Sequence, residues 1–177
     1  EKYAHLLELA KIVYPKSNRS EATKPLYFMR EIIIFARETL MRQGEILRLK
    51  KRDIDFVKGT VTITETKNNK PVKIGLSPKA IEILHQLPTT LDGRYFPVKD
   101  RKTFYNYWKV LAKAADLDMS FHTLRHMGAT DLIKQGWSIA EVQAQGNWKT
   151  LKALQRYLDI EGEHLASKLK YKRADFL

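Results

Sequence analysis

The chain has 177 residues, enough for one substantial domain with its own hydrophobic core. Its 32 basic and 20 acidic side chains leave a net charge of +12, spread as +5, +4 and +3 over residues 1–60, 61–119 and 120–177. An excess spread in this way predicts a folded basic surface rather than a basic tail. Such a surface favours a polyanionic partner, although charge alone fits a merely solvated surface about equally well.

The composition argues against several classes of protein. The absence of cysteine excludes disulfides and thiolate metal sites, and it fits an intracellular, cytoplasmic protein. The longest apolar run, residues 32–36, is far shorter than the roughly 18 residues of a membrane span, so no membrane partner is expected. Because the chain begins at Glu1 and not at methionine, we expect it to be a fragment of a longer protein.

The first third of the chain predicts three helices. Leu6, Leu9, Ala10 and Val13 follow the spacing of an amphipathic helix, and a polar loop is expected over residues 15–24. A second helix is expected over residues 25–39, because proline suits the first helical position, and a short third one over residues 43–49.

The sequence then changes to the alternation of strands. Residues 54–57 and 60–64 flank a turn at Lys58-Gly59, which predicts a hairpin. A second turn over residues 67–70 leads to a third run, residues 72–74. We therefore expect a small three-stranded antiparallel sheet.

The remainder of the chain predicts helices again. Ser77-Pro78 is a capping residue followed by proline, and Ser138 with Glu141 matches a capping box. Residues 88–100 are predicted to form a loop. The expected helices cover residues 77–87, 102–115, 122–135, one that begins at Ser138, 150–158 and 163–169. The fold class is therefore α+β, mainly α-helical with one small sheet, as a single domain over residues 1–177.

One helical turn carries the most reactive group of side chains. His122, Arg125 and His126 lie at a spacing that places His122 and Arg125 on one face of a helix. A guanidinium fork and an imidazole are what binding and proton exchange at a phosphate require. A zinc helix of the H-E-x-x-H type is excluded because position 123 is threonine. The remaining alternative is a helix start with one buried histidine and a surface arginine.

The run H-T-L-R-H-x-x-A-T, from His122 to Thr130, resembles the second box of the tyrosine recombinases, the phage integrase family. That resemblance extends upstream, where residues 39–54 are similar to the box that carries the first catalytic arginine. Arg42 takes that place, and Glu45 matches a carboxylate that supports the site. Leu40 stands where glycine is usual and Gly44 where a small serine is usual, departures that we expect to affect the turn and not the chemistry.

Three further positions complete the resemblance, which covers about residues 25–158. The run Thr66 to Pro71 resembles the hairpin with the family's lysine, which implies Lys67 and leaves Lys70 as a rival. Trp148, nine residues before Tyr157, stands where the family has histidine or tryptophan, although core packing alone would also explain an indole. Tyr157 is the implied nucleophile, with leucine at 154 in place of the usual threonine; Tyr171 is at the wrong spacing.

The resemblance implies a DNA recombinase or integrase that cuts and rejoins strands through a 3′-phosphotyrosine link, without metal or cofactor. The implied catalytic set is Arg42, Lys67, His122, Arg125, Trp148 and Tyr157, supported by Glu45 and His126. The implied partners are double-stranded DNA, a tetramer that exchanges the tail 158–177, and an accessory DNA-bending or directionality factor. An amino-terminal DNA-clamping domain is expected to be missing from this fragment. The alternatives are a type IB topoisomerase-like nicking-closing enzyme and an inactive DNA-binding accessory protein.

Overall fold

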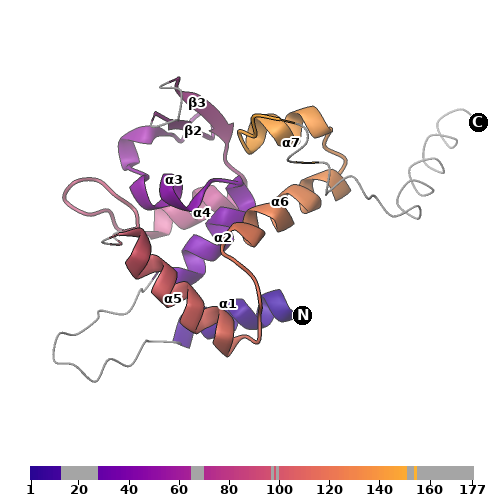
Figure 1. The fold of residues 1–177 in the computed structure, drawn as a ribbon. Helices are drawn as coiled ribbons and strands as arrows, with labels where there is room; N and C mark the ends of the chain where they lie inside the picture. Colours follow the sequence, from indigo (N-terminus) through magenta and orange to yellow (C-terminus); the bar gives the residue numbers. More distant parts are fainter. Residues whose placement is uncertain (13–27, 65–69, 97, 99, 151–153, 155–177) are drawn as a thin grey trace, which may run out of the picture.

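The computed structural model describes residues 1–12, 28–64, 70–96, 98, 100–150 and 154. In this part of the chain the fold is mainly helical with one small antiparallel sheet, which confirms the predicted fold class (Figure 1). The helices predicted over residues 150–158 and 163–169 and the tail 158–177 lie outside the described residues. The helices are α1 Lys2–Ile12, α2 Met29–Thr39, α3 Gln43–Arg48, α4 Pro78–Gln86, α5 Arg101–Ala114, α6 His122–Lys134 and α7 Ile139–Gln145, with a 3-10 turn η1 at Lys51–Asp53.

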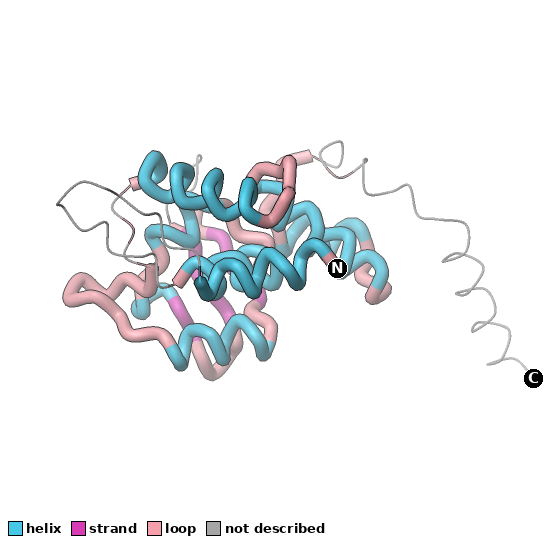
Figure 2. Tube along the Cα trace, turned by 90° about the horizontal axis from the view of Figure 1, so that it is seen from below, coloured by secondary structure: helices cyan, strands magenta, loops and turns pink. Residues whose placement is uncertain are grey.

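Helix α2 is the centre of the molecule. It packs against α1, α3, α4 and α6, and Ile32, Ile33 and Phe35 are wholly buried along it. Each such side chain contributes about 1.5–3 kcal/mol when it is removed from water. Figure 1 shows α2 between the sheet at one end and α1 with α5 at the other. Figure 2, seen from below, shows α1 in front of the strands. The helix begins at Met29, later than Pro25, because Phe28 has a non-helical backbone (φ −110°, ψ 18°).

The sheet has the order β1-β2-β3, with β1 at Ile54–Asp55, β2 at Thr60–Ile63 and β3 at Val72–Gly75. Both pairings are antiparallel, as predicted, and the β2–β3 register sets Val61 opposite Ile74. The first strand is shorter than expected. Asp55 Oδ1 accepts a hydrogen bond from the Lys58 amide at 3.0 Å, so residues 56–59 form the turn and Val57 is 98% exposed.

The capping signals are confirmed where they were predicted. Ser77 Oγ accepts from the Ala80 amide at 3.1 Å, and the same hydroxyl donates to Glu38 on α2 at 2.6 Å. At α7, Ser138 Oγ accepts from the Glu141 amide at 3.2 Å while Glu141 accepts from the Ser138 amide at 2.7 Å. These caps start both helices where the sequence places them and tie α4 to the central helix.

The connection between α4 and α5 is less peripheral than the sequence suggests. Tyr95 and Phe96 are 2% and 0% exposed, and the Tyr95 amide donates to the Leu49 carbonyl at 3.1 Å. This loop therefore closes one side of the core. In the described part of the chain, no helix combines the length and the apolar content that a membrane span requires.

Helix α6 lies close against α2 because Gly128 has no side chain. A Cβ at this position would lie 2.6 Å from Leu40 Cδ2 and nearer still to the Arg37 carbonyl oxygen. On the same interface, Arg37 Nε donates to Asp131 Oδ2 at 2.7 Å. Both features fix the helix that carries His122 and Arg125.

We expect Gly128→Ala to lower the free energy of unfolding by about 2–3 kcal/mol, since the new methyl group meets backbone that has no room to move. Urea denaturation at equilibrium measures the loss. The matched control is Lys134→Ala on the exposed end of the same helix, which should change stability by less than about 0.5 kcal/mol. An equal effect of both substitutions would contradict the close packing of α2 and α6.

Candidate active site

A cavity of about 710 Å³ opens where the α2–α3 turn, the start of β3 and the starts of α5 and α6 meet. Among the described residues its lining is strongly basic, with one carboxylate, from Glu45, and one imidazole, from His122. The cations in its lining are Arg42, Arg48, Lys70, Arg101, Arg125 and Lys149. A concave surface with this charge concentrates a positive potential that attracts an anion.

Arg42 is fixed from two directions at the start of α3. Its Nη1 donates to Glu45 Oε1 at 2.9 Å, and its Nη2 donates to the Asn147 carbonyl oxygen at 2.8 Å. Glu45 Oε2 also accepts from the Arg42 amide at 2.7 Å, so this carboxylate holds both the backbone and the side chain of the arginine. The Arg42 side chain is 41% exposed while that of Glu45 is 9% exposed, which leaves the guanidinium open to the cavity.

Arg125 is a buried charge, with 2% of its surface exposed. Nη1 donates to the Leu40 carbonyl oxygen at 2.7 Å and Nη2 donates to that of Gly146. Within the described residues its buried Nε has no hydrogen-bond partner. Burial, with a smaller contribution from the charge of Arg42, lowers the pKa of Arg125 to about 9, while Glu45 opposes the shift. The guanidinium stays protonated at neutral pH, but its environment favours a further negative partner.

Trp148 covers the guanidinium of Arg125, whose Cζ lies 4.0 Å from the centre of the indole ring. The indole is 9% exposed and does not line the cavity. It belongs instead to a second apolar cluster, with Leu40, Ala129, Ile133, Val142 and Leu154. The geometry therefore favours packing and a cation–π contact for Trp148, and the expected hydrogen bond from its N–H to a phosphate stays a prediction.

Asn147 has a left-handed backbone with φ of 50°, and so does Leu40, with φ of 58°, at the position where the family usually has glycine. This conformation explains why glycine is usual there, and it costs a non-glycine residue about 1–2 kcal/mol. The carbonyl oxygens of Leu40 and Asn147 accept from Arg125 and Arg42 respectively. The Leu40 carbonyl thus lies directly behind an arginine of the site, but a backbone oxygen is present whatever the side chain, so the expectation that the departure affects only the turn stays a prediction.

The two histidines of α6 differ in position. His122 lines the cavity together with Arg125, in agreement with their predicted common face. His126 does not line the cavity; its ring lies behind His122, with the ring centres 4.5 Å apart and the planes at 87°. His126 is therefore placed to orient His122, and both of their chemical roles remain predictions.

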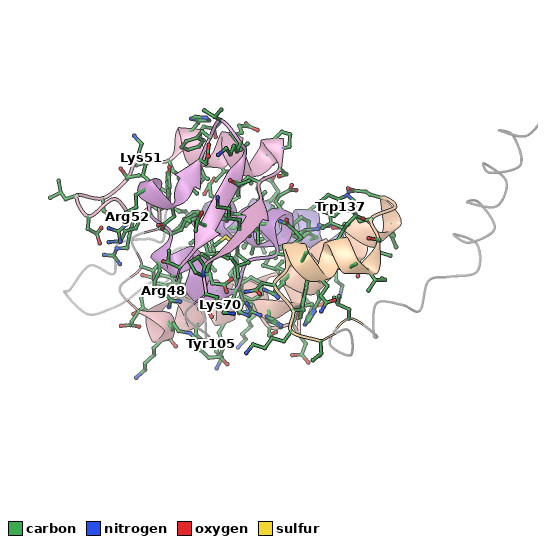
Figure 3. The ribbon with its side chains drawn as sticks, turned by 90° about the horizontal axis from the view of Figure 1, so that it is seen from above. Arg48, Lys51, Arg52, Lys70, Tyr105 and Trp137 are labelled. Atoms are coloured by element: carbon green, nitrogen blue, oxygen red, sulfur yellow. The ribbon has the colours of Figure 1, made fainter. Side chains whose placement is uncertain are left out.

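Two predicted residues, Lys67 and Tyr157, lie outside the described part of the chain. The rival lysine, Lys70, lines the cavity just before β3. Figure 3 shows Lys70 near Arg48, while Lys51 lies apart from them and Trp137 lies beyond the C-terminal end of α6. The hairpin thus brings at least one lysine to the site, and the choice between the two stays open.

The sequence reasoning missed three cations of the cavity: Arg48, Arg101 and Lys149. Arg48 lies six residues after Arg42, at the end of α3, and Lys149 follows Trp148 directly, so proximity to a motif was a usable signal for both. Arg101 starts a helix from another part of the chain, and only the tertiary fold brings it to the site.

We expect sulfate, a tetrahedral dianion, to bind this cavity and to raise the melting temperature more than chloride at equal ionic strength. Binding at ten times the dissociation constant adds about 1.4 kcal/mol of stability. The effect should be full well below pH 9 and decline as the pH rises through the Arg125 pKa of about 9, where half of the guanidinium has lost its proton.

Arg125→Met is the control for this experiment, since sulfate also stabilises proteins without binding them. The variant should show only the general effect, at every pH. An equal sulfate-specific shift in both proteins would place the anion elsewhere.

Comparison with known proteins gives a consistent result. The Shufflon-specific DNA recombinase of Escherichia coli is 33% identical over 144 residues, which is 80% of this chain and 37% of the relative. The Integrase of Salmonella phage P22 is 27% identical over 164 residues, 82% of this chain and 42% of the relative. This chain therefore spans less than half the length of either protein.

The fold comparison agrees with the sequence comparison. The catalytic domain of bacteriophage HP1 integrase superposes with a TM-score of 0.70 at 20% identity, covering 96% of this chain and 90% of that one. The profile of the Phage integrase family matches residues 16–164. The chain belongs to the phage integrase family, the tyrosine recombinases.

Proposed function

We propose that this chain is the catalytic domain of a site-specific DNA recombinase or integrase that cuts and rejoins strands through a 3′-phosphotyrosine intermediate. One observation supports this most strongly. Arg42 and Arg125, far apart in the sequence, line one basic cavity together with His122. A site of this composition suits a phosphodiester, whose cleavage builds negative charge on the non-bridging oxygens.

The two arginines would hold the scissile phosphate. Each has two donors already committed to carbonyl or carboxylate oxygens, so each guanidinium is fixed before the substrate arrives. Fixed donors stabilise developing charge without reorganising at the moment of reaction. Arg42 is the more exposed of the two, and Arg125 supplies charge from a buried position where its electrostatic effect is larger.

The chemical step would transfer two protons and exchange one bond to phosphorus. The Tyr157 oxygen attacks the phosphorus and its proton passes to His122, because a phenol with a pKa of about 10 needs a base near neutral pH. The bond from phosphorus to the 5′ oxygen breaks, and a hairpin lysine, Lys67 or Lys70, donates a proton to that oxygen. The products are a 3′-phosphotyrosine and a free 5′ hydroxyl.

Strand joining would reverse these steps with a different 5′ hydroxyl. That hydroxyl attacks the phosphotyrosine, and the tyrosine recovers its proton. Since the phosphodiester energy is kept in the covalent link, no nucleotide cofactor is required.

Double-stranded DNA is the proposed substrate. The net charge of +12 and the basic cavity support it. So does the similar fold of the XerH site-specific recombinase, which was solved bound to its difH substrate (TM-score 0.64). The tetramer, the tail exchange, the accessory factor and the additional DNA-clamping domain remain predictions that follow from family membership.

The proposal is tested by covalent trapping. The protein and a Tyr157→Phe variant are incubated with nicked duplexes that carry the junction DNA of the element encoding it, then quenched with detergent. We expect a protein–DNA adduct that maps to Tyr157 and is absent from the variant. An adduct that only rejoins its own strand would indicate a nicking-closing enzyme. No adduct from either protein would favour a DNA-binding accessory role.

The choice between the two hairpin lysines has its own test. A 5′-bridging phosphorothiolate releases a thiolate, which needs no proton donor, so it should restore cleavage to a variant that lacks the general acid. We expect Lys67→Ala to lose at least about 100-fold in phosphodiester cleavage, within the usual range for general-acid catalysis, and to recover on the sulfur substrate. If the cleavage activity of Lys70→Ala recovers on the sulfur substrate instead, Lys70 is the general acid. If neither variant recovers, no lysine of the hairpin acts as the general acid.

A further inference from the structure

Gln145, the last residue of α7, connects three segments of the site through its side chain. Its Oε1 accepts from the Gly75 amide at 2.9 Å, and its Nε2 donates to the Gly75 carbonyl oxygen at 2.8 Å. The same Nε2 donates to the Thr39 carbonyl oxygen at 3.1 Å. The amide therefore pairs with the end of β3 as a neighbouring strand would, and at the same time it holds the end of α2.

Each of these contacts lies next to a part of the cavity. Thr39 directly precedes Leu40, whose carbonyl oxygen holds Arg125. Gln145 itself directly precedes Gly146 and Asn147, whose carbonyl oxygens hold Arg125 and Arg42. Gly75 ends the strand whose first residue, Val72, lines the cavity together with Lys70, which lies just before the strand. The side chain of Gln145 thus joins the supports of both arginines to the strand that brings in a lysine.

We propose that Gln145 is a positioning residue that sets the hairpin edge of the cavity relative to the arginine pair. This inference rests on the proposed function, since it concerns how the hairpin lysine is positioned relative to the two arginines that would hold the phosphate. Gln145 does not line the cavity, so it acts through the groups it holds.

Only a side-chain amide satisfies all three contacts. A carboxylate of the same size would accept from the Gly75 amide but would face the carbonyl oxygens of Gly75 and Thr39 without a hydrogen to donate. An apolar side chain would make none of the three bonds. The contacts with Gly75 are exposed, so their loss should change the stability of the fold little. A shift of about 1 Å in a catalytic group, in contrast, can cost 100-fold in rate.

The test compares Gln145→Leu and Gln145→Glu with wild type on two nicked duplexes, one with an ordinary scissile phosphodiester and one with a 5′-bridging phosphorothiolate. The matched control is Gln135→Leu, at an exposed position just after α6. Hydrogen exchange of the Gly75 amide reports the contact itself, without DNA.

We expect both Gln145 variants to lose about tenfold in phosphodiester cleavage and less than about threefold on the sulfur substrate, because a misplaced proton donor matters only for the oxygen leaving group. The Gly75 amide should exchange faster in Gln145→Leu and stay protected in Gln145→Glu, which keeps the acceptor. The control should match wild type in every measurement.

Two results would overturn the inference. An equal loss on both substrates would indicate general damage to the fold, and unchanged phosphodiester cleavage would show that the hairpin needs no such tie. Failure of the proposed function has a different signature, since wild type itself would then form no covalent adduct on either duplex.

Discussion

The guanidinium of Arg125 is the group around which the site is built. It joins the turn after α2 to the end of α7 through two carbonyl oxygens, and the Trp148 indole covers it. Hydrogen bonds to a charged group contribute about 1.5–3 kcal/mol each, and a desolvated cation–π contact contributes about 2 kcal/mol. These contacts offset the cost of burying a charge, and the depressed pKa of Arg125 shows that the offset is incomplete. A bound phosphate would complete it.

The same arrangement explains where the backbone departs from ordinary conformations. Leu40 and Asn147 both have left-handed backbones, and each turns a carbonyl oxygen toward an arginine of the site. Strain of this kind persists when the surroundings fix it, and here the burial of Leu40 and the stacking of Trp148 do so. Stability of the fold and orientation of the arginines therefore depend on the same two turns.

Motif spacing predicted several residues that line the cavity, including the carboxylate that holds Arg42, but not the backbone groups that hold the arginines. Arg42, Glu45, His122 and Arg125 follow from local patterns, because each box is a short run of sequence. The carbonyl partners of the arginines depend on the backbone conformation at Leu40, Gly146 and Asn147. The order of side-chain types along the sequence does not reveal that conformation. The buried Tyr95 and Phe96 and the contribution of Arg101 likewise arise from tertiary packing, whereas β1 is short because Asp55 accepts from the Lys58 amide in a local turn. The bridging role of Gln145 became visible only once β3 and α7 were seen together.

We infer that Arg42 and Arg125 form one binding site for a tetrahedral oxyanion. The most direct test is a crystal structure of the protein with tungstate, a heavy analogue of phosphate that anomalous scattering locates without ambiguity. We expect a tungstate ion in the basic cavity, within hydrogen-bonding distance of both guanidinium groups and beside His122. A cavity without tungstate, in crystals that bind the ion elsewhere on the basic surface, would contradict it.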